Sequence, residues 1–141
     1  MKLSDQTLDY WIHHARKIAA MAHYGQSRTD GSPYIDHPTR VADAVEDRLK
    51  PIAFLHDTIE DTQVTLEELK DEGFPSYIID AVDLLTHRKG VSNIDYWTKI
   101  KANPDALAVK LADINDNVND NPSDHAKQKY AKALMFFGVS Q

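Results

Sequence analysis

The sequence predicts an all-α protein, a compact bundle of about seven to eight helices that forms a single domain over residues 1–141. Apolar residues recur every three or four positions along most of the chain, as on the buried face of an amphipathic helix. Glycine and proline stand where these segments start and stop, and no segment alternates apolar and polar residues as a half-buried strand does. A chain of 141 residues is long enough to bury a core without disulfides.

Three helices are expected in the first part of the chain. The first runs from about residue 4 to 24, with Ser4 as its N-cap and Gly25 as its stop. A polar loop follows it. Pro38 then opens the second helix and Pro51 the third, because the first turn of a helix accepts a residue that has no N–H group.

The remaining helices are expected from similar signals. Thr65 and Glu68 form a capping box at the start of a short helix that ends near Gly73. Ser92 or Asn93 caps a later helix. The other helical segments cover residues 76–86, 93–102, 105–119 and 124–137.

Composition limits the classes of function. The net charge of −6 argues against a general nucleic-acid binder, which presents a basic face, but it is compatible with a small phosphorylated ligand. No apolar run has the length of a membrane span, and the N-terminus lacks the apolar core of a signal peptide. There is no cysteine, which excludes disulfides and thiolate metal ligands. We therefore expect a cytoplasmic protein without a nucleic-acid or membrane partner.

The segment from Ala53 to Thr62 is the most informative part of the sequence. It contains His56, Asp57, Glu60 and Asp61 beside an apolar stripe. Residues three or four apart share a face of a helix, so the imidazole and the carboxylates are expected to lie together. Three like charges crowded on one face repel one another unless a cation binds there. The segment therefore predicts a metal site.

Four residues are candidate ligands of this metal: His37, His56, Asp57 and Asp113. His37 lies at a junction between loop and helix, and Asp113 lies in a helix beside its buried stripe. Taken singly, such an aspartate is usually a solvated charge and such a histidine is usually a turn residue. Two imidazoles and two carboxylates without sulfur suit Mn²⁺, Fe²⁺, Zn²⁺ or Mg²⁺, and the spacing does not choose among them.

Taken in order, the motifs resemble a known family. The chain carries His-Pro at residues 37–38, then His-Asp followed three residues later by Glu-Asp within 54–62, and Lys-Leu-Ala-Asp at 110–113. This order resembles the HD superfamily of metal-dependent phosphohydrolases. More narrowly, it is similar to the hydrolase domain of the RelA/SpoT-homologue family and its stand-alone small alarmone hydrolases, which are guanosine-3′,5′-bis(diphosphate) 3′-pyrophosphohydrolases. Further matching segments are residues 22–28, 31–38 and 129–134.

The resemblance implies a fold, a cofactor and a reaction. The fold is an all-α bundle of HD-domain architecture, in which the four candidate ligands hold one Mn²⁺. The reaction is hydrolysis of the 3′-pyrophosphate of guanosine tetra- or pentaphosphate, which gives GDP or GTP and pyrophosphate. Glu60 and Asp61 match the acidic pair that positions and activates the attacking water. Arg28 and Asn117 match residues that contact the nucleotide, the expected small-molecule partner.

The chain departs from the family pattern at several positions. Thr29 stands where a lysine is common, and Ile114 and Asp116 stand where an arginine and a histidine are usual. We expect these changes to surround the nucleotide and not the metal, so they bear on the identity of the substrate. Arg88 or Lys89 can supply contacts to phosphate that other members place elsewhere.

Two other functions stay open. The same site can act on another nucleotide: an adenosine analogue of the 3′-pyrophosphate, the 2′-phosphate of NADPH, or a nucleoside phosphate. Alternatively, the chain is a catalytically silent nucleotide-binding module. The Glu60–Asp61 pair beside four intact ligand positions argues against the silent module, because loss of activity removes the reason to keep crowded carboxylates. A panel of nucleotides separates hydrolysis of the guanosine compound from hydrolysis of another nucleotide.

Overall fold

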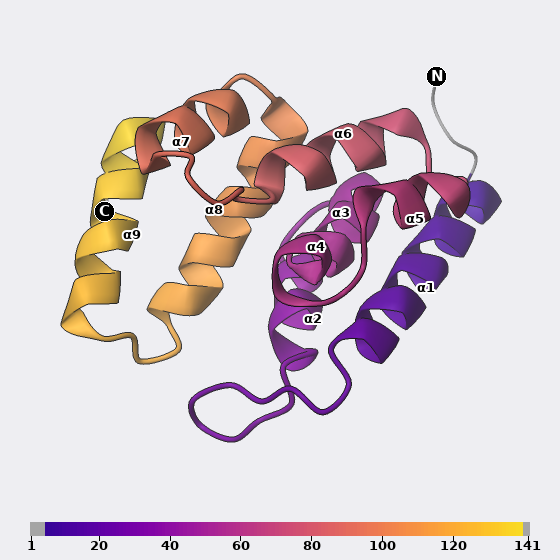
Figure 1. Cartoon of the computed structure of the whole chain (residues 1–141), viewed down its shortest axis with the longest axis horizontal. Helices are drawn as coiled ribbons and strands as arrows, with labels where there is room; N and C mark the ends of the chain where they lie inside the picture. Colours follow the sequence, from indigo (N-terminus) through magenta and orange to yellow (C-terminus); the bar gives the residue numbers. More distant parts are fainter. Residues whose placement is uncertain (1–4, 140–141) are drawn as a thin grey trace.

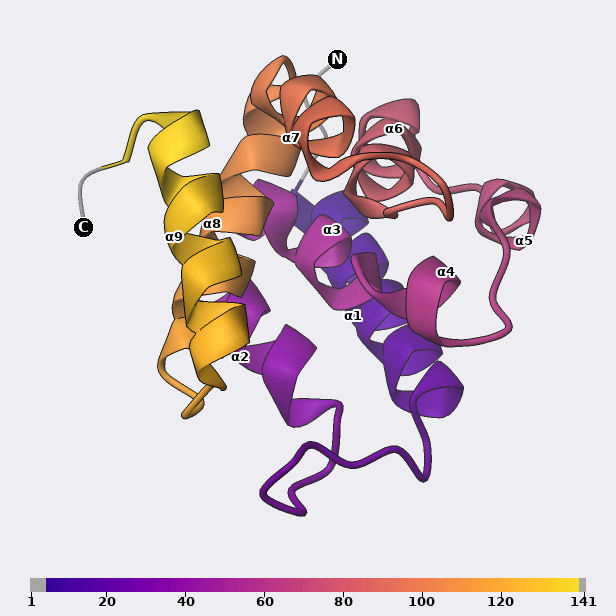
Figure 2. The ribbon, with the colours of Figure 1, turned by 60° about the vertical axis from the view of Figure 1, so that its left-hand side comes forward.

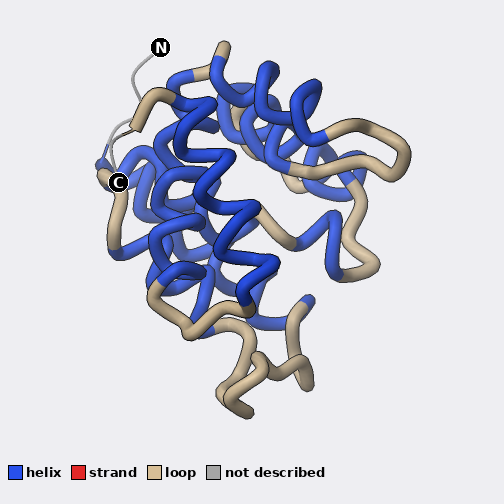
Figure 3. The backbone as a smooth tube through the Cα atoms, turned by 90° about the vertical axis from the view of Figure 1, so that its left-hand side faces the viewer, coloured by secondary structure: helices blue, strands red, loops and turns tan. Residues whose placement is uncertain are grey.

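The computed structural model describes residues 5–139, and this part of the chain is all-helical, as predicted (Figure 3). It forms nine α-helices and one short 3-10 helix and contains no β-strand. An isolated antiparallel bridge joins Ser27 to Pro33 in the loop after the first helix. The expected N-cap Ser4 lies outside the described residues. None of the described helices is both long and apolar enough to span a membrane.

The first half of the chain surrounds a short buried helix. Its elements are α1 (Asp5–Ala22), α2 (Asp36–Asp43), the 3-10 helix η1 (Asp47–Leu49), α3 (Lys50–Leu55), α4 (Thr58–Asp61) and α5 (Leu66–Asp71). Both α1 and α2 pack against α3 (Figure 2). A loop of residues 23–35 connects α1 to α2 at one end of the bundle (Figure 1). Helix α2 begins two residues before Pro38, which still lies in its first turn.

The second half of the chain is built around its longest helix. Its elements are α6 (Ser76–Leu85), α7 (Asn93–Lys101), α8 (Pro104–Val118) and α9 (Asp124–Phe137). Helix α8 packs against α6, α7 and α9, and it also contacts α2 and α3 of the first half (Figure 2). Residues on α8 are therefore carried to the helices of the first half, although they are distant in sequence.

Helix α3 lies at the centre of the core, since every residue from Pro51 to Leu55 is buried. Ile78 of α6 and Val109 of α8 belong to the same cluster of buried side chains. Burying one aliphatic side chain of this size stabilises a fold by about 1.5–3 kcal/mol. Packing on several sides fixes the position of the two residues that follow α3.

Several helix ends follow the predicted signals, although α1 ends at Ala22 and not at Tyr24. The Thr65 hydroxyl accepts a hydrogen bond from the Glu68 N–H group at 3.1 Å, and the Glu68 carboxylate accepts one from the Thr65 N–H group at 3.3 Å. This confirms the capping box. Ser92, and not Asn93, caps α7. Gly138 ends α9 at a φ of 77°, a left-handed conformation that glycine adopts without strain.

The segment expected to form the third helix is two helices, α3 and α4, with a break at His56 and Asp57. Side chains take up the last carbonyl groups of α3. The His56 ring donates from Nδ1 to the Ala53 carbonyl at 2.6 Å, and the Thr58 hydroxyl donates to the Leu55 carbonyl at 2.8 Å. The break lets two consecutive residues face one centre, whereas a continuous helix turns them about 100° apart.

Candidate metal centre

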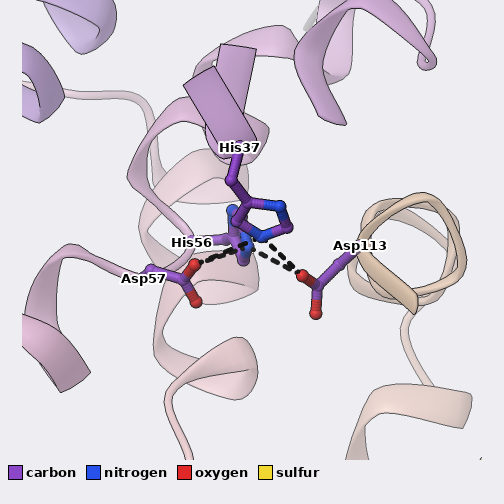
Figure 4. Close-up of side chains that lie close together, drawn as sticks. All are labelled: His37, His56, Asp57 and Asp113. Atoms are coloured by element: carbon purple, nitrogen blue, oxygen red, sulfur yellow. Dashed lines mark hydrogen bonds and ion pairs between the residues drawn. The ribbon is translucent and has the colours of Figure 1, made fainter. Parts of the chain in front are cut away.

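The four candidate ligands converge on one point (Figure 4). His37 comes from α2, His56 and Asp57 come from the break between α3 and α4, and Asp113 comes from α8. One donor atom from each lies within 4.8 Å of the others. His37 Nε2 is 2.9 Å and His56 Nε2 is 3.3 Å from the same Asp113 oxygen. His56 Nε2 is also 3.0 Å from Asp57 Oδ2.

Both imidazole rings are oriented by a hydrogen bond on the far side of the ring. His37 Nδ1 donates to Asp116 Oδ2 at 2.6 Å, and His56 Nδ1 donates to the Ala53 carbonyl at 2.6 Å. Both rings are buried. With Nδ1 engaged in each ring, both Nε2 atoms face the shared centre, which is the arrangement that metal-binding histidines use.

Both carboxylates are held by neighbouring donors. Asp57 Oδ2 accepts a hydrogen bond from the Tyr34 hydroxyl at 2.7 Å. Asp113 Oδ2 accepts from Lys110 Nζ at 3.1 Å, and Asp113 Oδ1 accepts from the Asn117 amide at 3.2 Å. These partners fix the side chains in place and leave oxygens turned toward the two Nε2 atoms.

The charges of the cluster keep its carboxyl groups ionised. Burial by itself would raise the pKa of Asp113, but Lys110 and His56 lower it well below its ordinary value. Burial has the same tendency at Asp57, where the charge of His56 outweighs it and lowers the pKa. For His56, burial would lower the pKa, but Asp57 and Asp113 raise it well above its ordinary value. The cluster therefore attracts positive charge strongly.

The donor set fits a divalent cation. Nδ1 of each ring already donates a hydrogen bond, so a neutral ring presents its lone pair at Nε2, toward the carboxylate oxygens. A cation at the centre would lie between these electron-rich atoms and would take two imidazoles and two carboxylates as four ligands. Nitrogen and oxygen donors of this kind suit Mn²⁺, Fe²⁺ or Zn²⁺.

The two acidic residues of the expected catalytic pair face different cavities. Glu60 lines the cavity that contains the ligand cluster, and its Oε1 atom accepts a hydrogen bond from the His87 N–H group at 2.8 Å. Asp61 lines a neighbouring cavity together with Gln26, and its carboxylate is 3.5 Å from the Tyr34 hydroxyl. Burial and the charges of nearby carboxylates raise the pKa of Asp61. Glu60 and Asp61 are adjacent in sequence, but only Glu60 lines the cavity that contains the ligand cluster.

Arg28 and Asn117 lie together, as expected, but only one of them lines the site cavity. Arg28 donates from Nη2 to the Asn117 side-chain oxygen at 3.1 Å and from Nε to Asp120 at 2.7 Å. Asn117 lines the cavity and also donates to Asp113, whereas Arg28 is not among the lining residues. The loop of residues 23–35 thus reaches the C-terminal end of α8 through an ion pair.

Other polar and aromatic side chains complete the cavity. Lys110 and Lys129 contribute positive charge, and Tyr96 and Tyr130 contribute aromatic rings. Lys110 Nζ also lies 5.4 Å from the centre of the Tyr96 ring. Lys129 and Tyr130 belong to the closing segment of the sequence resemblance, but no spacing argument could link them to the ligands, because α9 reaches the cavity only through tertiary packing.

One expectation about the departures from the family pattern is wrong. Asp116 was expected beside the nucleotide, yet its carboxylate binds the Nδ1 side of His37 and so lies beside the ligand cluster. The reason is helical spacing, because Asp116 follows Asp113 by three residues and shares its face of α8. Ile114 is buried in the core and also lines the cavity, and Thr29 is exposed in the loop after α1.

The two basic residues of the segment after α6 that were expected to contact phosphate, Arg88 and Lys89, lie outside the lining of the site cavity. Arg88 donates to Asp83 at 2.6 Å. His87 is the residue of this segment that lines the cavity, and its ring stacks on Tyr96 with centroids 4.3 Å apart. The segment therefore contacts the site through its backbone and through an aromatic stack.

The all-helical bundle and its cluster of two histidines and two aspartates agree with the HD-domain architecture that the sequence resemblance implies. No protein-family model matches the chain. Individual proteins do match it, both in sequence and in fold.

Several curated relatives match the chain in sequence. It is 42% identical over 83 residues to the guanosine-3′,5′-bis(diphosphate) 3′-pyrophosphohydrolase of Haemophilus influenzae, a match that covers 55% of this chain and 11% of that protein. The protein of the same name from Aquifex aeolicus is 31% identical over 136 residues, covering 81% of this chain and 19% of the relative. A probable GTP pyrophosphokinase of Mycobacterium leprae is 32% identical over 115 residues, covering 72% of this chain and 15% of the relative. The chain spans less than a fifth of the length of these relatives.

A solved structure of a metazoan orthologue of SpoT matches the fold. The TM-score is 0.73 at 22% identity, and the match covers 97% of this chain and 87% of that one. That orthologue hydrolyses ppGpp and plays a role in starvation responses. The likeness shows that the two chains share a fold. Together with the sequence matches, it confirms the resemblance to the HD-type hydrolase domain of the RelA/SpoT-homologue family.

Proposed function

We propose that the chain is a metal-dependent hydrolase that removes the 3′-pyrophosphate from guanosine tetra- or pentaphosphate and releases GDP or GTP. The observation that carries this proposal is the convergence of His37, His56, Asp57 and Asp113 on one centre, in a cavity that Glu60 also lines. Several curated relatives are named for this reaction, which supports the choice of substrate.

The four converging residues would hold one divalent cation, and we propose Mn²⁺. Such a cation supplies positive charge against phosphate oxygens and lowers the pKa of water, so that a nucleophile forms at neutral pH. The ligands come from α2, from the break between α3 and α4, and from α8. The site is therefore complete only when these three segments are packed together, which couples cation binding to folding.

Glu60 is proposed to take the proton of the attacking water. The His87 N–H group holds one oxygen of its carboxylate, which leaves the second oxygen to accept a proton. The water oxygen bonds to the phosphorus next to the 3′ oxygen, the bond from that phosphorus to the 3′ oxygen breaks, and the 3′ oxygen takes up a proton. General acid–base assistance of this kind typically contributes about 10²–10⁴ to the rate.

Asp61 is proposed to act less directly. Its carboxylate approaches the hydroxyl of Tyr34, and the same hydroxyl donates to Asp57 at 2.7 Å. Because burial and the Asp57 charge raise the pKa of Tyr34, this hydroxyl stays a donor at neutral pH. Asp61 therefore influences the orientation of one candidate ligand from the neighbouring cavity.

Arg28 and Asn117 are proposed to contact the nucleotide. Asn117 connects the ligand cluster to Arg28, since it donates to Asp113 and accepts from the guanidinium group. Arg28 already pairs with Asp120, so a nucleotide either competes with that carboxylate or binds the remaining N–H groups of the guanidinium fork. The lysines of the cavity add positive charge for the phosphates.

We further propose that residues 1–141 act as one domain in the cytoplasm, with a nucleotide as its partner. One cluster of buried side chains extends from α1 to α9 and supports a single cooperative unit. The oligomeric state is measured separately by light scattering during size-exclusion chromatography.

A panel of nucleotides tests the substrate. Mn²⁺-loaded protein and a Glu60→Gln variant are incubated with guanosine tetraphosphate, with its adenosine analogue, with NADPH and with nucleoside phosphates. The products are separated by anion exchange. Appearance of GDP and pyrophosphate from the guanosine compound, with the wild type only, supports the proposal.

The other outcomes of the panel favour the alternative functions. Cleavage of a different nucleotide, with no turnover of guanosine tetraphosphate, keeps the hydrolytic site but replaces the substrate. No cleavage of any member, by protein that binds both Mn²⁺ and a nucleotide, identifies the silent binding module.

A further inference from the structure

Asp116 of α8 contacts a candidate ligand without being one itself. Its Oδ2 atom accepts a hydrogen bond from His37 Nδ1 at 2.6 Å, and the two residues are 79 positions apart in the chain. The His37 side chain is 1% exposed and that of Asp116 is 13% exposed. The contact is thus shielded from water and joins α2 to α8 directly behind the ligand cluster.

The contact selects which nitrogen of His37 faces the cluster. A neutral imidazole has one N–H donor and one lone pair, so a donating Nδ1 leaves the lone pair on Nε2. His37 Nε2 is the atom that lies 2.9 Å from Asp113 and 3.5 Å from Asp57. A carboxylate bound to the far nitrogen also makes an imidazole a more basic metal ligand. Asp116 therefore supplies both an orientation and an electronic effect.

Arg40 holds the carboxylate of Asp116 in place. Its Nε atom donates to Asp116 Oδ1 at 2.7 Å, and its Nη2 atom donates to Oδ2 at 3.2 Å. A two-point pair of this kind fixes the plane of the carboxylate as well as its position. Arg40 lies on α2, three residues after His37, so both contacts of Asp116 reach the same helix.

We propose that Asp116 is a positioning residue of the metal centre, which holds the His37 ring with Nε2 turned to the ligand cluster while Arg40 holds Asp116. This inference rests on the proposed metal-dependent function, because it concerns the same site. It assigns a role to a residue outside the four ligands, the acidic pair and the nucleotide contacts. One face of α8 then supplies a ligand, Asp113, and the group that orients a second ligand.

The test measures Mn²⁺ affinity in Asp116 variants. Free Mn²⁺ gives a sharp electron paramagnetic resonance signal that is lost on binding, so a titration gives the dissociation constant without any nucleotide. Asp116→Ala is expected to weaken Mn²⁺ binding by about 10–100-fold, the usual effect of removing a partner of a metal-binding histidine. Asp116→Asn keeps an oxygen that can accept from Nδ1, so its loss is expected to be smaller.

A matched control separates positioning from helix packing. Asp105, also on α8, forms the same kind of two-point pair with Arg48 of η1, but it does not contact a candidate ligand. Asp105→Ala removes an ion pair between α8 and the first half of the chain and is expected to leave the Mn²⁺ dissociation constant unchanged. Circular dichroism at the titration temperature establishes that each variant is folded.

The outcomes distinguish this inference from the proposed function. Wild-type affinity for Mn²⁺ in Asp116→Ala overturns the positioning role and leaves the metal-dependent hydrolase intact. An equal loss in Asp105→Ala also overturns it, because packing would then explain the effect. No Mn²⁺ binding by the wild type overturns both. A loss confined to the Asp116 variants, and greater for alanine than for asparagine, supports the role.

Discussion

The imidazole rings of the two histidines of the site are both buried, but they are held in place in different ways. His56 donates from Nδ1 to the carbonyl group of Ala53, only three residues earlier, so one turn of backbone sets its orientation. His37 donates from Nδ1 to Asp116, which is 79 residues away on another helix. The first arrangement depends on local chain geometry, and the second depends on how α2 packs against α8. The His37 arrangement is therefore the more sensitive to changes elsewhere in the fold.

The same contrast divides the whole site into two halves. The local half consists of residues adjacent in sequence: His56, Asp57, Glu60 and Asp61. The long-range half consists of residues that only packing brings together: His37, Asp113 and Asp116. A cation bound between them would join the two halves. Under the proposed function, the chemistry belongs mainly to the local half, which holds Glu60, while the position of the ligands depends on the long-range half.

The largest effect is expected in the chemistry of the local half. Glu60→Gln removes the proposed proton acceptor and should lower kcat by about 10²–10⁴-fold, with Mn²⁺ affinity unchanged. Asp61→Asn should lower kcat less, because Asp61 lines the neighbouring cavity. Single-turnover hydrolysis of guanosine tetraphosphate measures both. Equal losses in the two variants would contradict the division of roles between these neighbours.

The next effect is expected when the cation that joins the halves is removed. At a Mn²⁺ concentration one hundred times its dissociation constant, binding should stabilise the fold by about 2.7 kcal/mol. Differential scanning calorimetry with Mn²⁺ and with a chelator measures the change in Tm. An Asp113→Asn variant, which lacks one ligand of the long-range half, is the control and should show a much smaller change. Identical Tm values for the wild type with and without Mn²⁺ would count against the site.

A smaller effect is expected at the nucleotide contacts. Arg28→Ala should raise KM about tenfold with little change in kcat, since a hydrogen bond to a charged group is worth about 1.5–3 kcal/mol. Arg48→Ala is a matched control, because Arg48 also pairs with an aspartate, Asp105 of α8, but contacts no described residue that lines the cavity. Steady-state kinetics measures KM and kcat separately. An unchanged KM in Arg28→Ala would make Arg28 a structural residue.

The smallest effect is expected at a local contact outside the site. Thr65→Ala removes the capping box of α5 and should destabilise the fold by about 1 kcal/mol, since the N-cap oxygen is lost. Urea unfolding measures the loss, and kcat and KM should stay at their wild-type values. A change in KM would mean that α5 affects the site, so that this local contact is not independent of it.

Most of the fold could be predicted from local signals. The apolar spacing and the prolines and glycines placed the helices, and the last of them matches its expected range of residues 124–137. The break between α3 and α4 was missed because it depends on side chains that take up backbone carbonyls at His56 and Thr58. The apolar periodicity shows which residues face the core, but it does not show where side chains hydrogen-bond to backbone carbonyl groups.

The local half of the site was also accessible from the sequence, because its residues are neighbours in the chain. The order of motifs pointed to His37 and Asp113, but no spacing rule could reveal what holds them. Asp116 was expected beside the nucleotide, although its distance of three residues from Asp113 was a usable signal. The pair of Arg28 with Asp120 could not be foreseen, because it forms only when the loop of residues 23–35 reaches the end of α8.

The most direct measurement is the number of Mn²⁺ ions bound per chain. Electron paramagnetic resonance titrations would be run on the wild type, on His56→Ala from the local half and on Asp113→Asn from the long-range half. If both halves form one site, the wild type binds one equivalent and neither variant binds Mn²⁺ at the same concentration. A wild type that binds none, or a variant of either half that retains a full equivalent, would contradict a shared metal centre.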